Sequence, residues 1–305
     1  MKKLVSLTLV ALLVGCKSKS GPADAGPPDV TPVLGSVTVE DRTPAPPASV
    51  TIDAAALTKQ LENQLRSAGV FAAPGTGGDA GSGPVARVRV ELAVEEVRTE
   101  EKGAARASMR FRVDTRPSGL SGGHWNEDVQ AGGETLYPLK PAPDIKTAFT
   151  KLTSRMLGDL TASYLGRQKI WQGGDKEVAA ALTADAGEPR TEAIRVVATR
   201  HLTSQVPTLL KMLSAEEETV RDAALGALVE LRERRAVSEL AKQRSMRDQR
   251  EMRKILDAIA TLGGDEAVEY LSFVADAHED EEIKAMAKQA LERLKRRSGT
   301  GGEKK

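Results

Sequence analysis

The chain has 305 residues, and because domains commonly contain about 150 residues, we expect roughly two domains. Its 44 Lys and Arg residues nearly balance its 43 Asp and Glu residues. The net charge of +1 therefore provides no field that attracts nucleic acid, and we expect no nucleic-acid partner. Aromatic residues make up 3% of the chain, which argues against platforms for stacking bases or sugars. The single cysteine, Cys16, excludes an intramolecular disulfide, a zinc ribbon and a Cys-x-x-Cys redox centre.

The first residues have the pattern of an export signal. A basic start, Met1-Lys2-Lys3, precedes an apolar run from Leu4 to Gly15 that is too short to cross a bilayer. The run ends in Leu13-Val14-Gly15-Cys16, which resembles the bacterial lipobox. The resemblance implies a signal peptide over residues 1–15, recognition of Leu13, Val14 and Gly15 by the signal peptidase, and lipidation of Cys16 with diacylglycerol and an acyl chain such as palmitate. Two or more chains anchor a protein stably. A buried N-terminal helix with a chance cysteine is the alternative.

The residues after the cysteine bear on location and reach. Residue 17 is Lys rather than the Asp that signals inner-membrane retention in this lipoprotein family, so the resemblance implies the outer membrane, with the protein facing the periplasm. Residues 16–34 are rich in Pro, Gly, Ala and Asp, which predicts a disordered tether. Extended at about 3.1 Å per residue, such a tether reaches on the order of 55 Å.

Residues 35–172 are predicted to form an α+β domain. Apolar and charged residues alternate from Val88 to Val94 and from Ala105 to Asp114, which is typical of half-buried strands. The turn near Lys102-Gly103 indicates an antiparallel pair. Residues 37–39 and 125–131 are predicted as further strands. The glycine-rich residues 72–84 lack the Lys-Ser/Thr pair of a phosphate loop and are interpreted as a flexible linker.

Two helices are expected beside these strands. Asp53 is a predicted N-cap for a helix with Leu57, Leu61 and Leu65 on one face. Asp144 is a predicted cap for a second helix, whose apolar face contains Ile145, Phe149, Leu152, Met156, Leu160 and Tyr164. We therefore predict an antiparallel sheet with two helices on one face. The order of elements is similar to that of small periplasmic domains of the TolB N-terminal and curli-secretion kinds.

Residues 174–297 contain an internal repeat. Apolar residues recur every 31 positions in two series, Val206, Val237, Val268 and Leu209, Leu240, Leu271. Upstream of them, an apolar helix pattern at 224–231 recurs at 255–262, and an earlier copy contains Ile194 and Val197. Each unit is interpreted as two helices joined by a tight turn such as Gly263-Gly264-Asp265. Neither helix can bury its apolar face alone, so the units are expected to stack.

Residues 220–231, VRDAALGALVEL, resemble the first helix of HEAT repeats in the short form of the phycobilisome-lyase-like group. The resemblance covers residues 190–294, although the copy at 251–262 departs from it at Glu251-Met252-Arg253-Lys254. It implies an all-α HEAT-like solenoid after the α+β domain, followed by a disordered tail over residues 298–305. An ordinary helix bundle is the alternative.

Catalytic and metal-binding patterns are scarce in the sequence. The histidines His124, His201 and His278 occur singly, without metal-ligand spacing, and Cys16 is assigned to the lipid. The acidic runs 216–218 and 279–282 precede predicted helices and suit their positive ends. Calcium binding at 276–282 is the sharper alternative, although the run lacks an EF-hand pattern. We predict no catalytic residues, no metal and no cofactor.

These patterns favour a non-enzymatic, lipid-anchored scaffold or adaptor that binds a protein partner in the cell envelope. In HEAT-like stacks the second helices line the concave side, so the expected partner surface consists of their outward positions: Thr208, Glu239, Tyr270, Lys211, Lys242 and Phe273. Two alternatives remain open. One is a component of an envelope assembly or secretion machine that oligomerises through the α+β domain. The other is an enzyme accessory of the bilin-lyase-like type.

Overall fold

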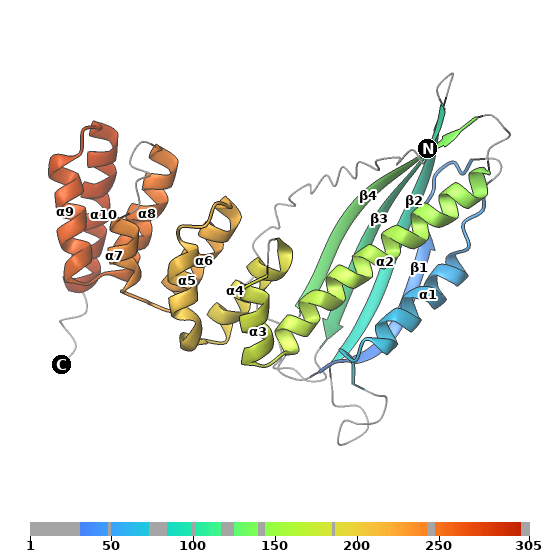
Figure 1. Ribbon diagram of the computed structural model, residues 1–305, viewed down its shortest axis with the longest axis horizontal. Helices are drawn as coiled ribbons and strands as arrows, with labels where there is room; N and C mark the ends of the chain where they lie inside the picture. The colour runs from blue at the N-terminus through green and yellow to red at the C-terminus, as the bar shows by residue number, and fades with distance from the viewer. Residues whose placement is uncertain are drawn as a thin grey trace, which may run out of the picture. The chain divides into compact units, whose positions relative to one another are not determined.

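The computed structural model describes residues 31–47, 50–72, 84–98, 102–116, 125–139, 144–184, 187–242 and 248–299. These residues form two compact units, with the boundary between Gln172 and Gly173 (Figure 1). The predicted signal peptide, Cys16 and the tether as far as residue 30 lie outside the described residues, as does the glycine-rich segment 73–83. The first strand begins at Val33, so the last two residues assigned to the tether belong to the sheet. The last helix ends at Gly299, so the segment predicted as a disordered tail begins inside it.

The first unit contains one sheet of four strands in the order β1-β2-β3-β4. Their bounds are β1 Val33–Asp41, β2 Val85–Arg98, β3 Lys102–Arg116 and β4 Trp125–Pro138. The predicted antiparallel pairing is confirmed for β2 with β3 and for β3 with β4. It is wrong for β1, which runs parallel to β2. Between these two strands the helix α1, Ala54–Ser67, provides the crossover that a parallel pair requires.

One face of the sheet is buried and the other is exposed. The apolar residues predicted to alternate along β2 and β3 are all buried: Val88, Val90, Leu92, Val94, Ala107, Met109, Phe111 and Val113. The charged residues between them lie on the open face. The prediction of half-buried strands with one wet face is therefore confirmed.

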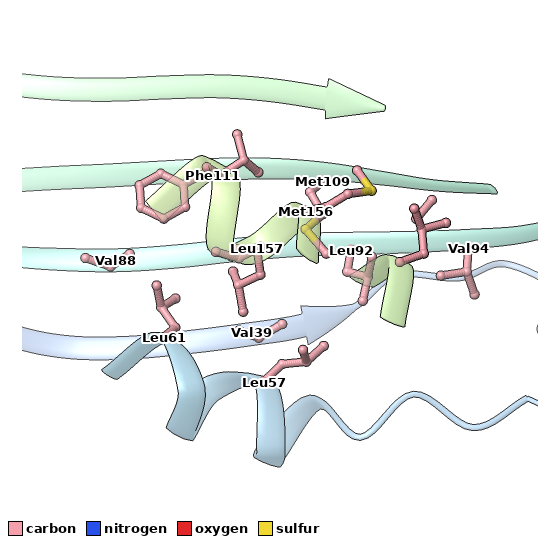
Figure 2. Packing of buried hydrophobic residues seen from close by; sticks show 14 of the residues in the cluster. Val39, Leu57, Leu61, Val88, Leu92, Val94, Met109, Phe111, Met156 and Leu157 are labelled. Atoms are coloured by element: carbon pink, nitrogen blue, oxygen red, sulfur yellow. The ribbon is translucent and has the colours of Figure 1, made fainter. Parts of the chain in front are cut away.

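The helices α1 and α2, Ile145–Gln172, cover the buried face of the sheet, as predicted. The Asp53 carboxylate accepts a hydrogen bond from the backbone N–H of Ala56 at 2.8 Å, and Asp144 accepts one from the N–H of Thr147 at 2.9 Å, so both predicted caps are confirmed. Figure 2 shows Leu57 and Leu61 of α1 pointing toward the strands. The six apolar residues predicted for the second helix are all buried.

The strand β4 extends to Pro138, seven residues beyond the predicted end at residue 131. The predicted end is too early because the adjacent glycines Gly132 and Gly133 suggest a turn in the sequence. A Cβ at Gly133 would lie 2.7 Å from Sδ of Met156, so the absence of a side chain lets α2 pack closely on the strand. At Gly132 a Cβ would meet nothing closer than the carbonyl oxygen of Ala107 at 4.0 Å.

The second unit is a stack of paired helices, and the predicted fold class is confirmed. Its elements are α3 Asp175–Leu182, α4 Glu188–Thr199, the 3₁₀ helix η1 Thr203–Gln205, α5 Val206–Met212, α6 Glu218–Glu230, α7 Ala236–Ala241, α8 Gln249–Leu262, α9 Asp265–Ala277 and α10 Glu281–Gly299. The first helices α4, α6, α8 and α10 pack one on the next. Each of α3, α5, α7 and α9 packs against the first helix that follows it.

A residue with a positive φ ends each of the first helices α4, α6 and α8. His201, Arg232 and Gly263 recur every 31 residues and have φ values of 52°, 54° and 68°. In the first two of these turns a hydrogen bond spans five residues, from the N–H of Leu202 to the carbonyl of Val197 and from the N–H of Glu233 to the carbonyl of Leu228. This is the usual way of ending a helix with a change of direction. The 31-residue repeat is therefore visible in the backbone conformation as well as in the spacing of apolar residues.

The apolar series of the repeat is buried with one exception. Leu209, Leu240 and Leu271 are at most 1% exposed, and Val206 and Val237 are at most 2% exposed. Val268, which the spacing placed with them, is 36% exposed. In the described part of the chain, no helix combines the length and hydropathy needed to cross a bilayer.

The left-handed turns generate a stability prediction. Left-handed backbone costs a residue with a Cβ about 1–2 kcal/mol, whereas glycine adopts it freely. Arg232→Gly should therefore stabilise the repeat unit by about 0.5 kcal/mol, after the entropy that glycine loses on folding. Gly263→Ala should destabilise it by about 1–3 kcal/mol, because the φ of 68° and ψ of −166° at Gly263 lie in a region that essentially only glycine adopts. Thermal melting followed by circular dichroism measures both changes.

Tryptophan fluorescence provides the control, because Trp125 and Trp171 both precede the repeat unit. The fluorescence transition should not move in either variant. Equal effects of the two substitutions on the helical transition would contradict the assignment of these turns.

Candidate functional site

The structure places the six predicted partner residues on the second helices. Thr208 and Lys211 lie in α5, Glu239 lies in α7 with Lys242 directly after it, and Tyr270 and Phe273 lie in α9. Lys211, Lys242 and Phe273 are exposed, whereas the other three residues are half-buried. A contact surface needs exposed side chains, and only three of the six predicted residues are exposed.

The six residues divide into two groups rather than forming one continuous surface. Helix α7 packs against α9, which brings the residues of these two helices onto neighbouring elements. Helix α5 packs mainly against η1 and α6. The second helices also differ in length, since α5 has 7 residues and α7 has 6, whereas α9 has 13.

Charge also differs between the second helices. Nζ of Lys242 lies 2.9 Å from Oε1 of Glu239, so these two predicted residues neutralise each other. Lys211 forms no ion pair with any residue that the structure describes. Burial raises the pKa of Tyr270, which keeps its phenol neutral and available as a hydrogen-bond donor.

The outward side of α9 combines apolar and acidic residues. Phe273 is 60% exposed and Val268 is 36% exposed, and they are the only large hydrophobic residues of the described repeat unit that are exposed. Four exposed carboxylates, Asp265, Glu266, Glu269 and Asp276, lie on the same helix. Within the described residues none of these four forms an ion pair. We call these six residues the α9 face.

A lysine-centred cluster joins the first helices α6 and α8. Nζ of Lys254 lies 3.1 Å from Oε1 of Glu218, 2.8 Å from Oδ2 of Asp222 and 3.0 Å from Oε1 of Glu251. Hydrogen bonds, first to Asp222 and then to Glu251, raise the pKa of Lys254. Within the described chain, these three carboxylates are the one group of His, Cys, Asp or Glu side chains close enough to share a metal ion. The ammonium of Lys254 supplies the cation there.

Lys254 belongs to the stretch where the repeat departs from its consensus. The departure is visible in the sequence. Its role in pairing is not, because the partners of Lys254 in α6 lie 32 and 36 residues earlier. A similar link follows one repeat later, where Arg293 of α10 donates a hydrogen bond to Asp257 of α8. Ion pairs thus connect α6 to α8 and α8 to α10 along this side of the stack.

The acidic run 279–282 serves as a helix cap. The Asp280 carboxylate accepts hydrogen bonds from the backbone N–H groups of Glu282 at 2.8 Å and Ile283 at 3.3 Å. Together with the side-chain hydrogen bond from Gln249, which is the largest cause, they lower the pKa of Asp280. Nδ1 of His278 accepts from the N–H of Asp280 at 3.0 Å. The calcium alternative at 276–282 thus competes with structural roles for both side chains.

The remaining sequence candidates are placed separately. His124 lies outside the described residues, and His201 occupies the exposed left-handed turn after α4. Glu96 accepts hydrogen bonds from Arg98 and Tyr137, the first of which is the largest reason that its pKa is lowered. These contacts give the Glu96 carboxylate a structural role at the end of β2.

The open face of the sheet contains a shallow depression of about 470 Å³. Its floor is a row of small residues across three strands, since Ala93 pairs with Ser108 and Ser108 with Gly132. The neighbouring row, Glu91 and Arg110, forms one side. The charges there are compensated within the sheet, and nothing in the depression selects a particular ligand.

No family model matches the chain, and no curated protein matches it. Among solved structures it is similar to two engineered proteins, at 20% and 19% sequence identity. Each similarity covers 50% of this chain and covers 76% and 45% of the engineered chains, with TM-scores of 0.31 and 0.30. It is also similar to the complex of CpcE and CpcF of phycocyanin lyase from Nostoc sp. PCC7120, at 20% identity over 52% of this chain and 69% of that chain, with a TM-score of 0.32. The assignment of the second unit as a helical repeat therefore rests on its own helix pairing.

The lysine-centred cluster predicts that Ca²⁺ can replace the ammonium of Lys254 once that ammonium is removed. Lys254→Met should destabilise the repeat unit by about 0.5–1 kcal/mol, because three carboxylates then repel one another, and high salt should reduce the loss. Millimolar Ca²⁺ should restore the melting temperature of this variant and leave that of the wild type unchanged. Thermal melting with and without Ca²⁺ measures this.

The matched control is Lys284→Met, which removes a single exposed pair with Glu281 at 2.7 Å. That variant should respond neither to salt nor to Ca²⁺. A calcium response of the wild type, or none in Lys254→Met, would show that the ammonium does not stand in for a cation.

Proposed function

We propose that the chain is a non-enzymatic, lipid-anchored protein of the cell envelope that binds a protein partner through the second helices of its repeat unit. The lipobox-like sequence that ends at Cys16 supports the anchor. The absence of Asp after this cysteine supports the outer membrane, facing the periplasm. Binding rather than catalysis is favoured because the three histidines occur singly in the sequence, without metal-ligand spacing or a cysteine nucleophile.

The α9 face is the observation that carries the proposal. Phe273 is 60% exposed, on a helix whose opposite face buries Leu271 and Val274. Aromatic residues of this kind are the common anchors of protein interfaces, whereas scattered exposed lysines are not. Val268 and the half-buried Tyr270 extend the apolar area along the same helix.

Charge gives the proposed surface a direction. The α9 face carries four carboxylates without ion pairs to described residues, whereas α5 carries the exposed Lys211. A partner with a basic region opposite α9 and an acidic region opposite α5 would therefore be recognised in one orientation. Such complementarity raises the association rate more than the affinity.

Partner capture tests the contribution of Phe273. Crosslinking in intact cells followed by mass spectrometry first identifies a protein bound to the wild type. Phe273→Ala should then reduce recovery of that protein about tenfold or more, equivalent to about 1.4 kcal/mol. Val85→Ala is the matched control, since Val85 is also an exposed apolar residue, at 36%, but lies in the first unit. Equal recovery from both variants would contradict the proposal.

The basic residues provide a second test. Lys211→Glu combined with Lys242→Glu should weaken capture of the same partner without changing the melting temperature, because both side chains are exposed. Unchanged capture would remove α5 and α7 from the surface and leave α9 alone.

The anchor is tested separately. Cys16→Ser should remain an uncut, unlipidated precursor, as shown by the intact mass of the protein and by incorporation of labelled palmitate. Correct processing of this variant would refute the lipobox assignment.

A further inference from the structure

The two edges of the sheet in the first unit differ in how they are protected. At the outer edge of β1, Val33 forms a bridge with Ala72, and the N–H of Ala72 donates to the carbonyl of Pro32 at 3.0 Å. The N–H of Val39 donates to Oγ1 of Thr58 at 3.0 Å. The register of β1 also shifts between residues 34 and 37. A bridge, a side-chain cap and an irregularity therefore hinder the addition of another strand at this edge.

The outer edge of β4 has none of these features among the described residues. Its register with β3 runs without a shift over 14 residues, from Trp125 to Pro138. No other described strand or isolated bridge joins it. Between its ends the strand contains neither Lys nor Pro, the residues that most often prevent pairing at edges. It also carries Leu136, an apolar side chain that is 60% exposed.

The acidic residues of β4 do not repel a second strand of the same kind, because each is neutralised within its own chain. Glu134 pairs with Arg106 at 2.5 Å, and Asp128 pairs with Arg110. Glu127 pairs with Arg167 of α2 at 3.0 Å. The hydrogen bond from Arg110 is the largest cause of a lowered pKa for Asp128, so this carboxylate stays ionised and paired.

The middle of the strand consists of small residues, Ala131, Gly132 and Gly133. When two identical strands pair antiparallel about a twofold axis, the residues nearest the axis meet their own counterparts. An axis at this position would place no bulky and no charged side chain against its own copy. The pairing would also keep the helix-covered faces of both sheets on the same side, so the assembly would close as a dimer.

We propose that the outer edge of β4 pairs antiparallel with the same edge in a second copy of the chain, so that two four-stranded sheets become one continuous sheet. The neutral charge of the edge and the small residues at its centre favour a second copy over a charged strand of another protein. This dimer is independent of the proposed partner surface, and Phe273→Ala should leave it intact.

Cysteine crosslinking in intact cells tests the geometry. Single cysteines are introduced at Gln130, Gly132 or Leu136, with Thr38→Cys on β1 as the control and the wild type as the background for Cys16. After oxidation, dimers should form through position 130 or 132 and not through 136 or 38, because only residues near the axis meet their own counterparts. Efficient dimers through 136, or crosslinks to a different protein in place of a second copy, would overturn the proposal.

The mass of the purified full chain in solution, measured over a range of concentrations, tests the stability of the dimer. The wild type should have twice the mass of one chain by light scattering. Gly132→Lys should raise the dimer dissociation constant at least about tenfold, since a lysine at an edge opposes pairing and a Cβ there meets only Ala107 O at 4.0 Å. Ser108→Lys is the matched control, because Ser108 is exposed and pairs with Gly132 one strand inward.

The control variant should remain dimeric, and circular dichroism should show that both variants are folded. A monomeric wild type at micromolar concentration, or equal dissociation constants for the two variants, would overturn the proposal.

Discussion

The helices of the repeat unit can bury their apolar faces only against neighbouring repeats, and the arrangement of that unit follows from this constraint. The first helices α4, α6, α8 and α10 form a continuous contact series, and each second helix packs on the first helix that follows. The left-handed residues at 201, 232 and 263 reverse the chain at equal intervals, so that each new pair of helices meets the previous pair in a similar way. Ion pairs such as Lys254 with Asp222 hold adjacent first helices in register.

The same constraint determines which surfaces remain available. The last helix, α10, buries Ile283, Ala287, Ala290 and Leu294 and exposes mostly charged residues, which is how a repeat array ends without an apolar surface. Helix α9 is longer than α5 and α7, and it leaves Phe273 exposed beside carboxylates that form no ion pair with a described residue. The proposed binding surface is thus the part of the stack that its own packing does not cover.

Local patterns predicted much of the fold correctly. Alternation in β2 and β3 and the caps Asp53 and Asp144 depend on a few neighbouring residues, and all were confirmed. The direction of β1 was not predictable, since it depends on which strand the chain meets after α1. The end of β4 was missed because Gly132-Gly133 suggests a turn unless the close approach of Met156 is known.

The candidate site was predicted less completely than the fold. The 31-residue spacing identified the second helices, but it could not show that Val268 is exposed, because exposure depends on how many helices pack against α9. The partners of Lys254 in α6 lie more than 30 residues away, and a charge alone does not indicate them. Of the three left-handed turns, only Gly263 has a residue type that signals one.

The binding of a partner at the α9 face is the central claim, and photocrosslinking from a single position tests it most directly. A photoreactive residue in place of the exposed Glu269 should, on irradiation of intact cells, form an adduct with one envelope protein. The same residue in place of Gln289, which is exposed on α10, should not form that adduct. Identical adducts from both positions, or none from position 269, would contradict the claim that this face is a binding surface.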